Sequence, residues 1–191
     1  LTRNPSAGDG LRGRLTAGYG SVNRERNAGL ALEGNRGPWG FYLSFQGVDA
    51  DNYRSPLGEV LESQYKQGSL LGKLAYRTER REVLLSFLGA RGTDIGKPNR
   101  TSAEKPTWYP RENQNLIQLK WQEKSLAGGE LTAMAFANPN FLETRTDTLD
   151  TLTGYKAKES FSRTESTDFG FQLAYDPVSY THLTLPTNRE V

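Results

Sequence analysis

Apolar and polar residues alternate along most of this chain, and this period of two limits its fold more than any other feature. The segment 39–46 shows the pattern most clearly, with an apolar parity and a mostly polar one: Trp39, Phe41, Leu43 and Phe45 against Gly40, Tyr42, Ser44 and Gln46. Successive side chains of a β-strand point to opposite faces of its sheet. The pattern therefore predicts strands with one apolar and one polar face.

Eight segments have this strand character, and no segment with helical periodicity competes with them. They are residues 11–19, 27–33, 39–46, 70–77, 83–88, 117–122, 130–137 and 168–175. In Glu130–Ala137 the facing stays open, because Leu131, Ala133 and Ala135 compete with Met134 and Phe136. We predict an all-β fold, an antiparallel meander of about eight strands, because the hairpin connections are too short for crossovers.

The connections differ at the two ends of the predicted strands. One end has short turns at Asn35–Pro38, Thr78–Arg81 and Ser125–Gly129, and the other has long polar stretches at Val48–Gln67, Arg91–Gln114 and Asn138–Thr167. Only Gly20–Arg26 is short where a long connection is expected. Short turns at one end and long loops at the other are typical of outer-membrane barrels. The sequence therefore predicts an open part of a transmembrane β-barrel.

Four aromatic residues fit this interpretation. Trp39 begins a strand just after a short turn, and Tyr76, Trp121 and Tyr175 each end a strand just before one. All four would lie at one height on the outward parity. Aromatic rings settle at the headgroup level of a bilayer, so we predict an interfacial girdle there.

Composition excludes several functions. The 191 residues carry 24 basic and 22 acidic side chains, interspersed along the chain, with a net charge of +2. A nucleic-acid partner is not expected, because there is no basic face or run. The absence of cysteine excludes disulfides and thiolate metal sites. His182 is the only histidine, so we predict neither histidine-based catalysis nor a His-rich metal site, no cofactor and no enzyme.

Two motifs resemble ligand sites without matching them. Gly92–Pro98 is one residue short of a phosphate loop between its glycines, and its lysine is followed by proline instead of serine or threonine. The carboxylates of Asp49–Asn52 have calcium-like spacing but lack the glycine and the terminal glutamate of an EF-hand. Both are interpreted as solvated loops.

Several stretches resemble TonB-dependent outer-membrane receptors. Asn4-Pro5-Ser6 followed by Gly8–Gly13, with Gly18-Tyr19-Gly20-Ser21, is similar to the passage from the plug to the first barrel strand of that family. The resemblance extends over residues 4–176, and three more stretches are similar to loops of the family: Asn52–Pro56, Asp94–Pro98 and Tyr109–Glu112. Its weight lies in the order of these motifs and in the rhythm of strands and loops.

The resemblance implies a barrel of about 22 strands filled by an N-terminal plug. It implies a location in the outer membrane of a Gram-negative bacterium, and uptake of a ferric siderophore, cobalamin or a similar scarce nutrient. The implied partners are outer-membrane lipid, the nutrient or metal chelate, and the TonB complex, which is contacted through the plug. This chain holds neither plug nor TonB-contacting segment, so we interpret residues 1–176 as the first barrel strands of a longer protein.

Two other interpretations remain open. One is a different outer-membrane barrel, such as a porin or a barrel enzyme. The other is a soluble antiparallel β-sheet binding module, for example a sandwich, which shows the same alternation. A sandwich would use shorter strands and would not need long loops confined to one end.

Two groups of residues are candidates for ligand contact. The long loops hold aromatic and arginine side chains that suit an anionic or aromatic ligand: Tyr53, Arg54, Trp108, Tyr109 and Arg111. The predicted lumen face presents a second, polar group: Arg12, Arg14, Glu33, Gln46, Lys73, Gln118, Lys120 and Gln122. For the lumen group the plainer interpretation is a hydrated wall that bonds to a plug.

The last stretch does not continue the pattern. Val178–Leu183 resembles the translation of a transposon-end sequencing adapter, although its β propensity would also allow a ninth strand. We interpret residues 177–191 as a non-native tail and assign them no function.

Overall fold

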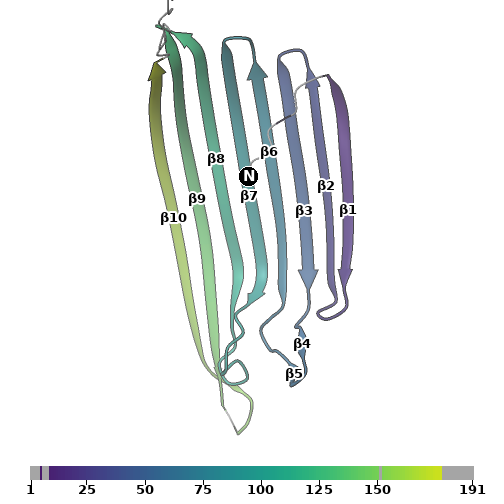
Figure 1. Ribbon diagram of the computed structural model, residues 1–191. Helices are drawn as coiled ribbons and strands as arrows, with labels where there is room; N and C mark the ends of the chain where they lie inside the picture. Colours follow the sequence, from purple (N-terminus) through teal and green to yellow (C-terminus); the bar gives the residue numbers. More distant parts are fainter. Residues whose placement is uncertain (1–4, 6–8, 151, 178–191) are drawn as a thin grey trace, which may run out of the picture.

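The strands of a computed structural model account for most of the chain (Figure 1). The structure describes residues 5, 9–150 and 152–177, and these residues form no helix. Of the tail interpreted above as non-native, only Pro177 lies within the described residues, at the end of the last strand. The strands are β1 (Gly10–Gly20), β2 (Glu25–Arg36), β3 (Trp39–Ala50), β4 (Arg54–Ser55), β5 (Gly58–Glu59), β6 (Tyr65–Arg77), β7 (Arg81–Gly96), β8 (Thr107–Leu126), β9 (Gly129–Leu149) and β10 (Lys156–Pro177).

Eight of these strands form one antiparallel sheet in the order β1-β2-β3-β6-β7-β8-β9-β10. Each strand therefore pairs with its neighbour along the chain, while β4 and β5 form a separate small hairpin between β3 and β6. The sheet is not closed, and β1 and β10 are its edges. The predicted all-β meander of eight antiparallel strands is confirmed.

Tight turns join the strands at one end, called here the turn end. Between β8 and β9 only Ala127 and Gly128 intervene, with φ of 48° and 78°. Positive φ at both central residues is typical of the type I′ turn, whose twist matches that of paired strands. The turn end of the other hairpins holds Gly37-Pro38 and Thr78–Arg80.

The opposite end, called the loop end, differs from the prediction. The long polar stretches are largely strand: β7 continues to Gly96, β8 begins at Thr107, and β9 and β10 extend to Leu149 and from Lys156. The connections that remain are residues 51–64, 97–106 and 150–155. These extensions lack an apolar parity, so alternation could not reveal them. Backbone ladder bonds between neighbouring strands hold them instead.

Exposure along the strands is the reverse of that in a soluble sheet. Large apolar side chains such as Phe45, Leu74 and Leu119 are exposed, whereas Glu33 and Lys73 are buried. The buried apolar residues Ala50, Ala75 and Leu84 all lie on the polar face, as the strand pairing shows. Side chains crowd on a concave surface, so this difference is what a sheet curving towards its polar face produces. No second layer of strands covers the apolar face in the described part of the chain.

Glycines make room for aromatic rings between neighbouring strands. A Cβ at Gly34 would lie 2.5 Å from Cε1 of Phe41, and a Cβ at Gly170 or Gly129 would meet the ring of Phe136 or Tyr175. In each case the ring fills the space that a side chain would need. These cross-strand contacts are part of the packing of the sheet.

Candidate functional site

The strand register assigns every central residue to one of the two faces, because directly paired residues share a face. Phe41 pairs with Leu74, Leu74 with Leu85, and Leu85 with Leu119. This row continues through Ala135 to Phe171, which settles the facing that the sequence left open in β9. Leu131, Ala133 and Ala135 lie on the apolar face, and Met134 and Phe136 lie on the polar face.

The four girdle candidates also lie on the apolar face, at the turn end. Trp39 pairs with Tyr76, and both share a row with Trp121 through Val83. Tyr175 lies in the adjacent row, because its partner Leu131 pairs with Glu123, two residues from Trp121. The rings of Trp39 and Tyr76 meet edge to face at 4.9 Å between centroids.

The polar face holds all eight lumen candidates. Arg12 is in register with Glu33, Lys73 and Gln118, and the same parity carries Arg14, Gln46, Lys120 and Gln122. Nη1 of Arg12 lies 4.0 Å from Oε1 of Glu33. Two neighbouring hollows open on this face, of about 370 and 410 Å³. Thr16 and Gln46 line both hollows, so the two hollows adjoin and share these polar side chains.

Tyr53 and Arg54 lie in the connection between β3 and β6, where Arg54 begins the short strand β4. Oδ1 of Asn52 closes this loop by accepting from the backbone N–H groups of Ser63 at 2.8 Å and Gln64 at 3.1 Å. Tyr53 binds across the same loop, since its N–H donates to Oγ of Ser63 at 3.0 Å. The loop thus displays the two exposed side chains from a braced backbone.

The prediction that Trp108, Tyr109 and Arg111 are loop residues is wrong. All three lie in β8, because the polar extensions of β7 and β9 pair with this segment on both sides. Each also has an internal partner. The guanidinium of Arg145 lies 5.4 Å from the Trp108 ring, Nζ of Lys97 lies 5.0 Å from the Tyr109 ring, and Arg111 lies 5.0 Å from the Phe141 ring. The contacts of Trp108 and Arg111 are therefore made within the sheet, and that of Tyr109 is made with the connection that follows β7.

Tyr53 and Trp108 both lie at the loop end, but only backbone contacts through β7 connect them. The N–H of Gly96 donates to the carbonyl oxygen of Gln64 at 2.9 Å, and Gly96 pairs with Trp108. The end of β7 thus joins the loop of Tyr53 to the strand of Trp108. Tyr53 with Arg54 and Trp108 with Tyr109 form two separate groups at the loop end.

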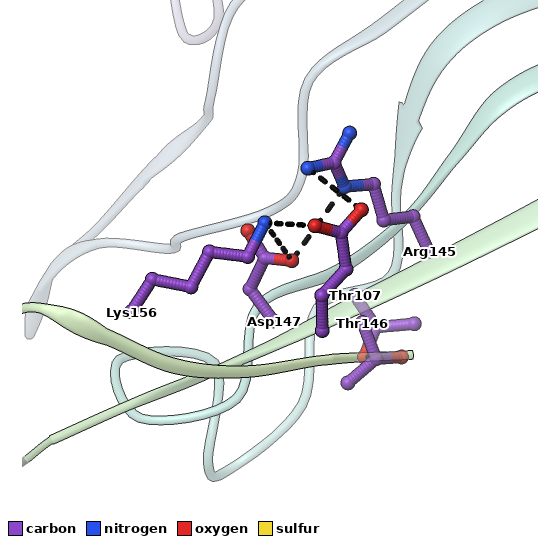
Figure 2. Close-up of polar contacts among 6 residues, drawn as sticks. Thr107, Arg145, Thr146, Asp147 and Lys156 are labelled. Carbon is purple, nitrogen blue, oxygen red and sulfur yellow. Dashed lines mark hydrogen bonds and ion pairs between the residues drawn. The ribbon is translucent and has the colours of Figure 1, made fainter. Parts of the chain in front are cut away.

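A polar cluster that the sequence did not reveal lies beside Trp108 (Figure 2). Nη2 of Arg145 lies 2.9 Å from Glu159, and Nζ of Lys156 lies 3.1 Å from Asp147 and 2.5 Å from Glu159. The contact with Glu159, followed by that with Asp147, raises the pKa of Lys156. Two cations face two anions, so the cluster has no net charge with which to attract a charged ligand.

The cluster joins β9 and β10 across their connection, which explains why spacing could not predict it. Its members fall on two strands, and the hydroxyls of Thr107 and Thr146 tie it to β8 at 3.0 Å. The only local signal is the recurrence of opposite charges at Arg145 and Asp147 and at Lys156 and Glu159. Its chemistry is that of a structural clamp.

A second polar contact connects the loops nearer β1. The hydroxyl of Tyr65 donates to Oε2 of Glu25 at 2.6 Å. This hydrogen bond is the main reason why the pKa of Glu25 is lowered and that of Tyr65 is raised. The start of β2 is thereby tied to the start of β6, across the intervening strand β3.

The interpretation of the two near-motifs as solvated loops is wrong in part, because each begins within a strand, β7 for Gly92 and β3 for Asp49. Gly92–Gly96 is the end of β7. The carboxylates of Asp49 and Asp51 each face a cation, Lys66 at 3.3 Å and Arg24 at 3.7 Å. Among the described residues no group of three or more metal-ligating side chains could hold a metal ion.

Comparison with known proteins adds no relative. No protein-family model, no curated protein and no solved structure matches the chain. Within the described ranges, no helix has the length and apolar character needed to cross a membrane.

Proposed function

We propose that the chain is part of the barrel wall of an outer-membrane TonB-dependent receptor that takes up a scarce nutrient such as a ferric siderophore or cobalamin. One observation carries the membrane part of this proposal: the sheet exposes its large apolar side chains and buries charged ones. A sheet in water would expose that apolar face at a high free-energy cost, whereas lipid would cover it.

The position of Pro5 supports a plug within the same barrel. Pro5 is buried, and its carbonyl oxygen accepts from Nη1 of Arg77 at 3.0 Å. A Cβ built at Gly40 would lie 3.1 Å from Cβ of Pro5. Both Arg77 and Gly40 belong to the polar face. Pro5 therefore lies on the polar side of the sheet, where a segment that leaves a plug would lie.

The polar face supports the same function. Its arginine, lysine and glutamine side chains and its two hollows suit hydrogen bonds to a plug or to hydrated cargo. A passive porin would use a similar wall. The two functions differ in their energy source, so dependence on TonB separates them.

Localisation and transport test the proposal with the full-length gene product. Cell fractionation should recover it in the outer membrane, and nutrient uptake should stop when TonB is deleted. Uptake that persists unchanged without TonB would favour the passive barrel. Recovery of the full-length protein in the soluble fraction would refute both.

Ligand contact is tested by alanine substitution at the loop end. If the braced loop captures cargo, Tyr53→Ala and Arg54→Ala should weaken binding while barrel assembly stays intact. Trp108→Ala and Arg111→Ala form the comparison pair, because their partners lie within the sheet. Equal affinity in all four variants, measured by equilibrium binding, would remove the ligand role from these residues.

A further inference from the structure

The apolar face contains an open hollow at the loop-end limit of its apolar rows. Three glycines form its floor on neighbouring strands: Gly47, Gly68 and Gly89. The hollow has a volume of about 940 Å³. On this face the glycines follow rows rich in leucine and phenylalanine, so the hollow continues the apolar surface.

One side of the hollow is apolar. Phe45 and Phe87 precede Gly47 and Gly89 by two residues on the same face, and Leu70 lies between them. The ring of Phe87 lies 2.9 Å from the position of a Cβ at Gly89, so it leans over that glycine. This side offers aromatic and aliphatic contact to an extended hydrocarbon chain.

The opposite side of the hollow carries cations. Arg26, Lys66 and Arg91 line it, together with Asp49. Asp49 is paired with Lys66 at 3.3 Å, but within the described part of the chain neither Arg26 nor Arg91 forms an ion pair. Two guanidinium groups are thus left for an external anion, and guanidinium geometry suits a phosphate group.

The height of these cations matches the thickness of a bilayer. Trp39 lies in the aromatic row at the turn end, and Asp49, in register with Arg26 and Lys66, lies ten residues further along β3 (49 minus 39). A tilted strand needs roughly 9–11 residues to cross the hydrocarbon region. If the aromatic row marks one interface, the cations lie at the headgroup level of the other.

We propose that this hollow binds a lipid with an anionic phosphate headgroup, its acyl chain against Phe45, Leu70 and Phe87 and its headgroup along the cationic side, which extends from Arg26 on β2 to Arg91 on β7. The inference rests on the membrane location proposed above. It adds a lipid site on the outer wall, separate from any cargo site on the polar face.

The test uses the full-length protein in nanodiscs of phosphatidylcholine containing a minority of phosphatidylglycerol. Lipids that remain bound after detergent extraction are quantified by mass spectrometry. Wild-type protein should retain phosphatidylglycerol in preference to phosphatidylcholine. Each basic side chain near a membrane surface contributes a factor of roughly five to six in lipid affinity, so Arg26→Gln with Arg91→Gln should lower retention about thirtyfold.

Two further variants separate the headgroup from the hollow. A Cβ at Gly68 has no heavy atom closer than 3.8 Å, so Gly68→Leu can fill the hollow without a backbone clash and should also reduce retention. The matched control is Arg14→Gln with Lys120→Gln, which removes two cations from the opposite, polar face and should leave the retention of both lipids unchanged.

Each outcome of these experiments either supports or overturns the lipid site. Equal retention of the two lipids by wild-type protein, or unchanged retention in the Arg26/Arg91 variant, overturns the lipid site. Insertion into the nanodisc is checked separately by the heat-dependent gel mobility of a folded barrel. A protein that inserts without lipid preference refutes this inference alone, and a protein that does not insert refutes the membrane proposal as well.

Discussion

The two sides of the sheet differ in how far their strands extend. β1, β2 and β3 have 11 or 12 residues, whereas β8, β9 and β10 have 20 to 22. Crossing a bilayer takes roughly 9–11 residues of strand. The strands β1 to β3 are therefore about as long as a bilayer crossing. The strands β8 to β10 are about twice that length.

Different interactions stabilise the turn-end part of the sheet and the strand extensions at the loop end. Near the turn end the apolar face is lined by leucine and aromatic residues, which need lipid or another apolar cover. In the extensions, paired charges and cation–aromatic contacts replace them, such as Arg145 with Glu159 and Arg163 with the Phe141 ring. The loop-end extensions can therefore stay ordered in water, whereas the order of the turn-end part depends on what covers its apolar face.

The largest expected effect compares the same substitution at the two heights of β10. Phe169 and Phe161 lie on one face and are both exposed, 77% and 59%. In the full-length protein folded in lipid, Phe169→Arg should lower the free energy of unfolding by about 2–4 kcal/mol, because it places a charge near the bilayer midplane. Phe161→Arg should cost less than about 1 kcal/mol.

Denaturant titration in lipid vesicles measures both values. Equal costs at Phe169 and Phe161 would mean that the two heights share one environment, and the comparison would fail. A large cost at Phe161 alone would reverse it.

The edge-to-face contact between Trp39 and Tyr76 should have a smaller effect. A double-mutant cycle with Trp39→Leu and Tyr76→Leu should give a coupling energy of about 0.5–1.5 kcal/mol, the range of such aromatic pairs. The same unfolding measurement in lipid gives this coupling. Complete additivity of the two substitutions would show that the rings act independently.

The clamp at the loop end should contribute less still. Arg145 is partly exposed, so Arg145→Gln should cost only about 0.2–1 kcal/mol, and the loss should shrink in high salt. Hydrogen exchange of the β9–β10 extension measures it locally. Lys158→Gln, which removes an exposed cation of β10 that forms no ion pair among the described residues, is the control. A salt-independent loss would contradict the electrostatic origin.

The smallest effect concerns pH at the connection between β9 and β10. Hydrogen bonds from the Thr153 N–H at 2.8 Å, the Thr153 hydroxyl and the Leu152 N–H lower the pKa of Asp150. A lowered pKa in the folded state stabilises the ionised form. This stabilisation is complete above the unfolded pKa and is lost as pH falls through the folded one, so the turn should loosen below about pH 4.

Amide exchange at Thr153 across this range should show the change. Asp150→Asn should remove most of its pH dependence, and the Ala127-Gly128 turn, which has no such carboxylate, should show little. An identical acid response at both turns would contradict the role of Asp150.

The sequence predicted the turn-end part of the sheet better than the loop-end extensions, for a physical reason. Alternation is visible where one face is apolar, and so residues 39–46 were placed correctly by parity alone. Trp108 and Arg111 were misplaced because strand structure there depends on pairing with β7 and β9, which local sequence does not encode. The Arg145–Glu159 contact was missed for the same reason, since its partners meet only once β9 and β10 pair.

The facing of β9 illustrates the same limit. Small alanines lie on the apolar face at Ala133, Ala135 and Ala137, while the larger Phe136 lies on the polar face against Gly170. Side-chain size alone therefore favours the wrong parity. Only the register with Trp121 and Leu119 resolves it.

The unequal edges of the sheet limit how it can be completed. β1 offers 11 residues of backbone donors and acceptors, and β10 offers 22. Pairing β1 directly with β10 would leave about half of the residues of β10 unpaired (22 minus 11 residues). Unpaired backbone groups at a sheet edge can pair with strands of other chains. In water, such an edge would act as a template for stacking copies side by side. A neighbouring strand as long as β10 would remove that hazard, so pairing of the β10 edge and resistance to aggregation become the same geometric requirement.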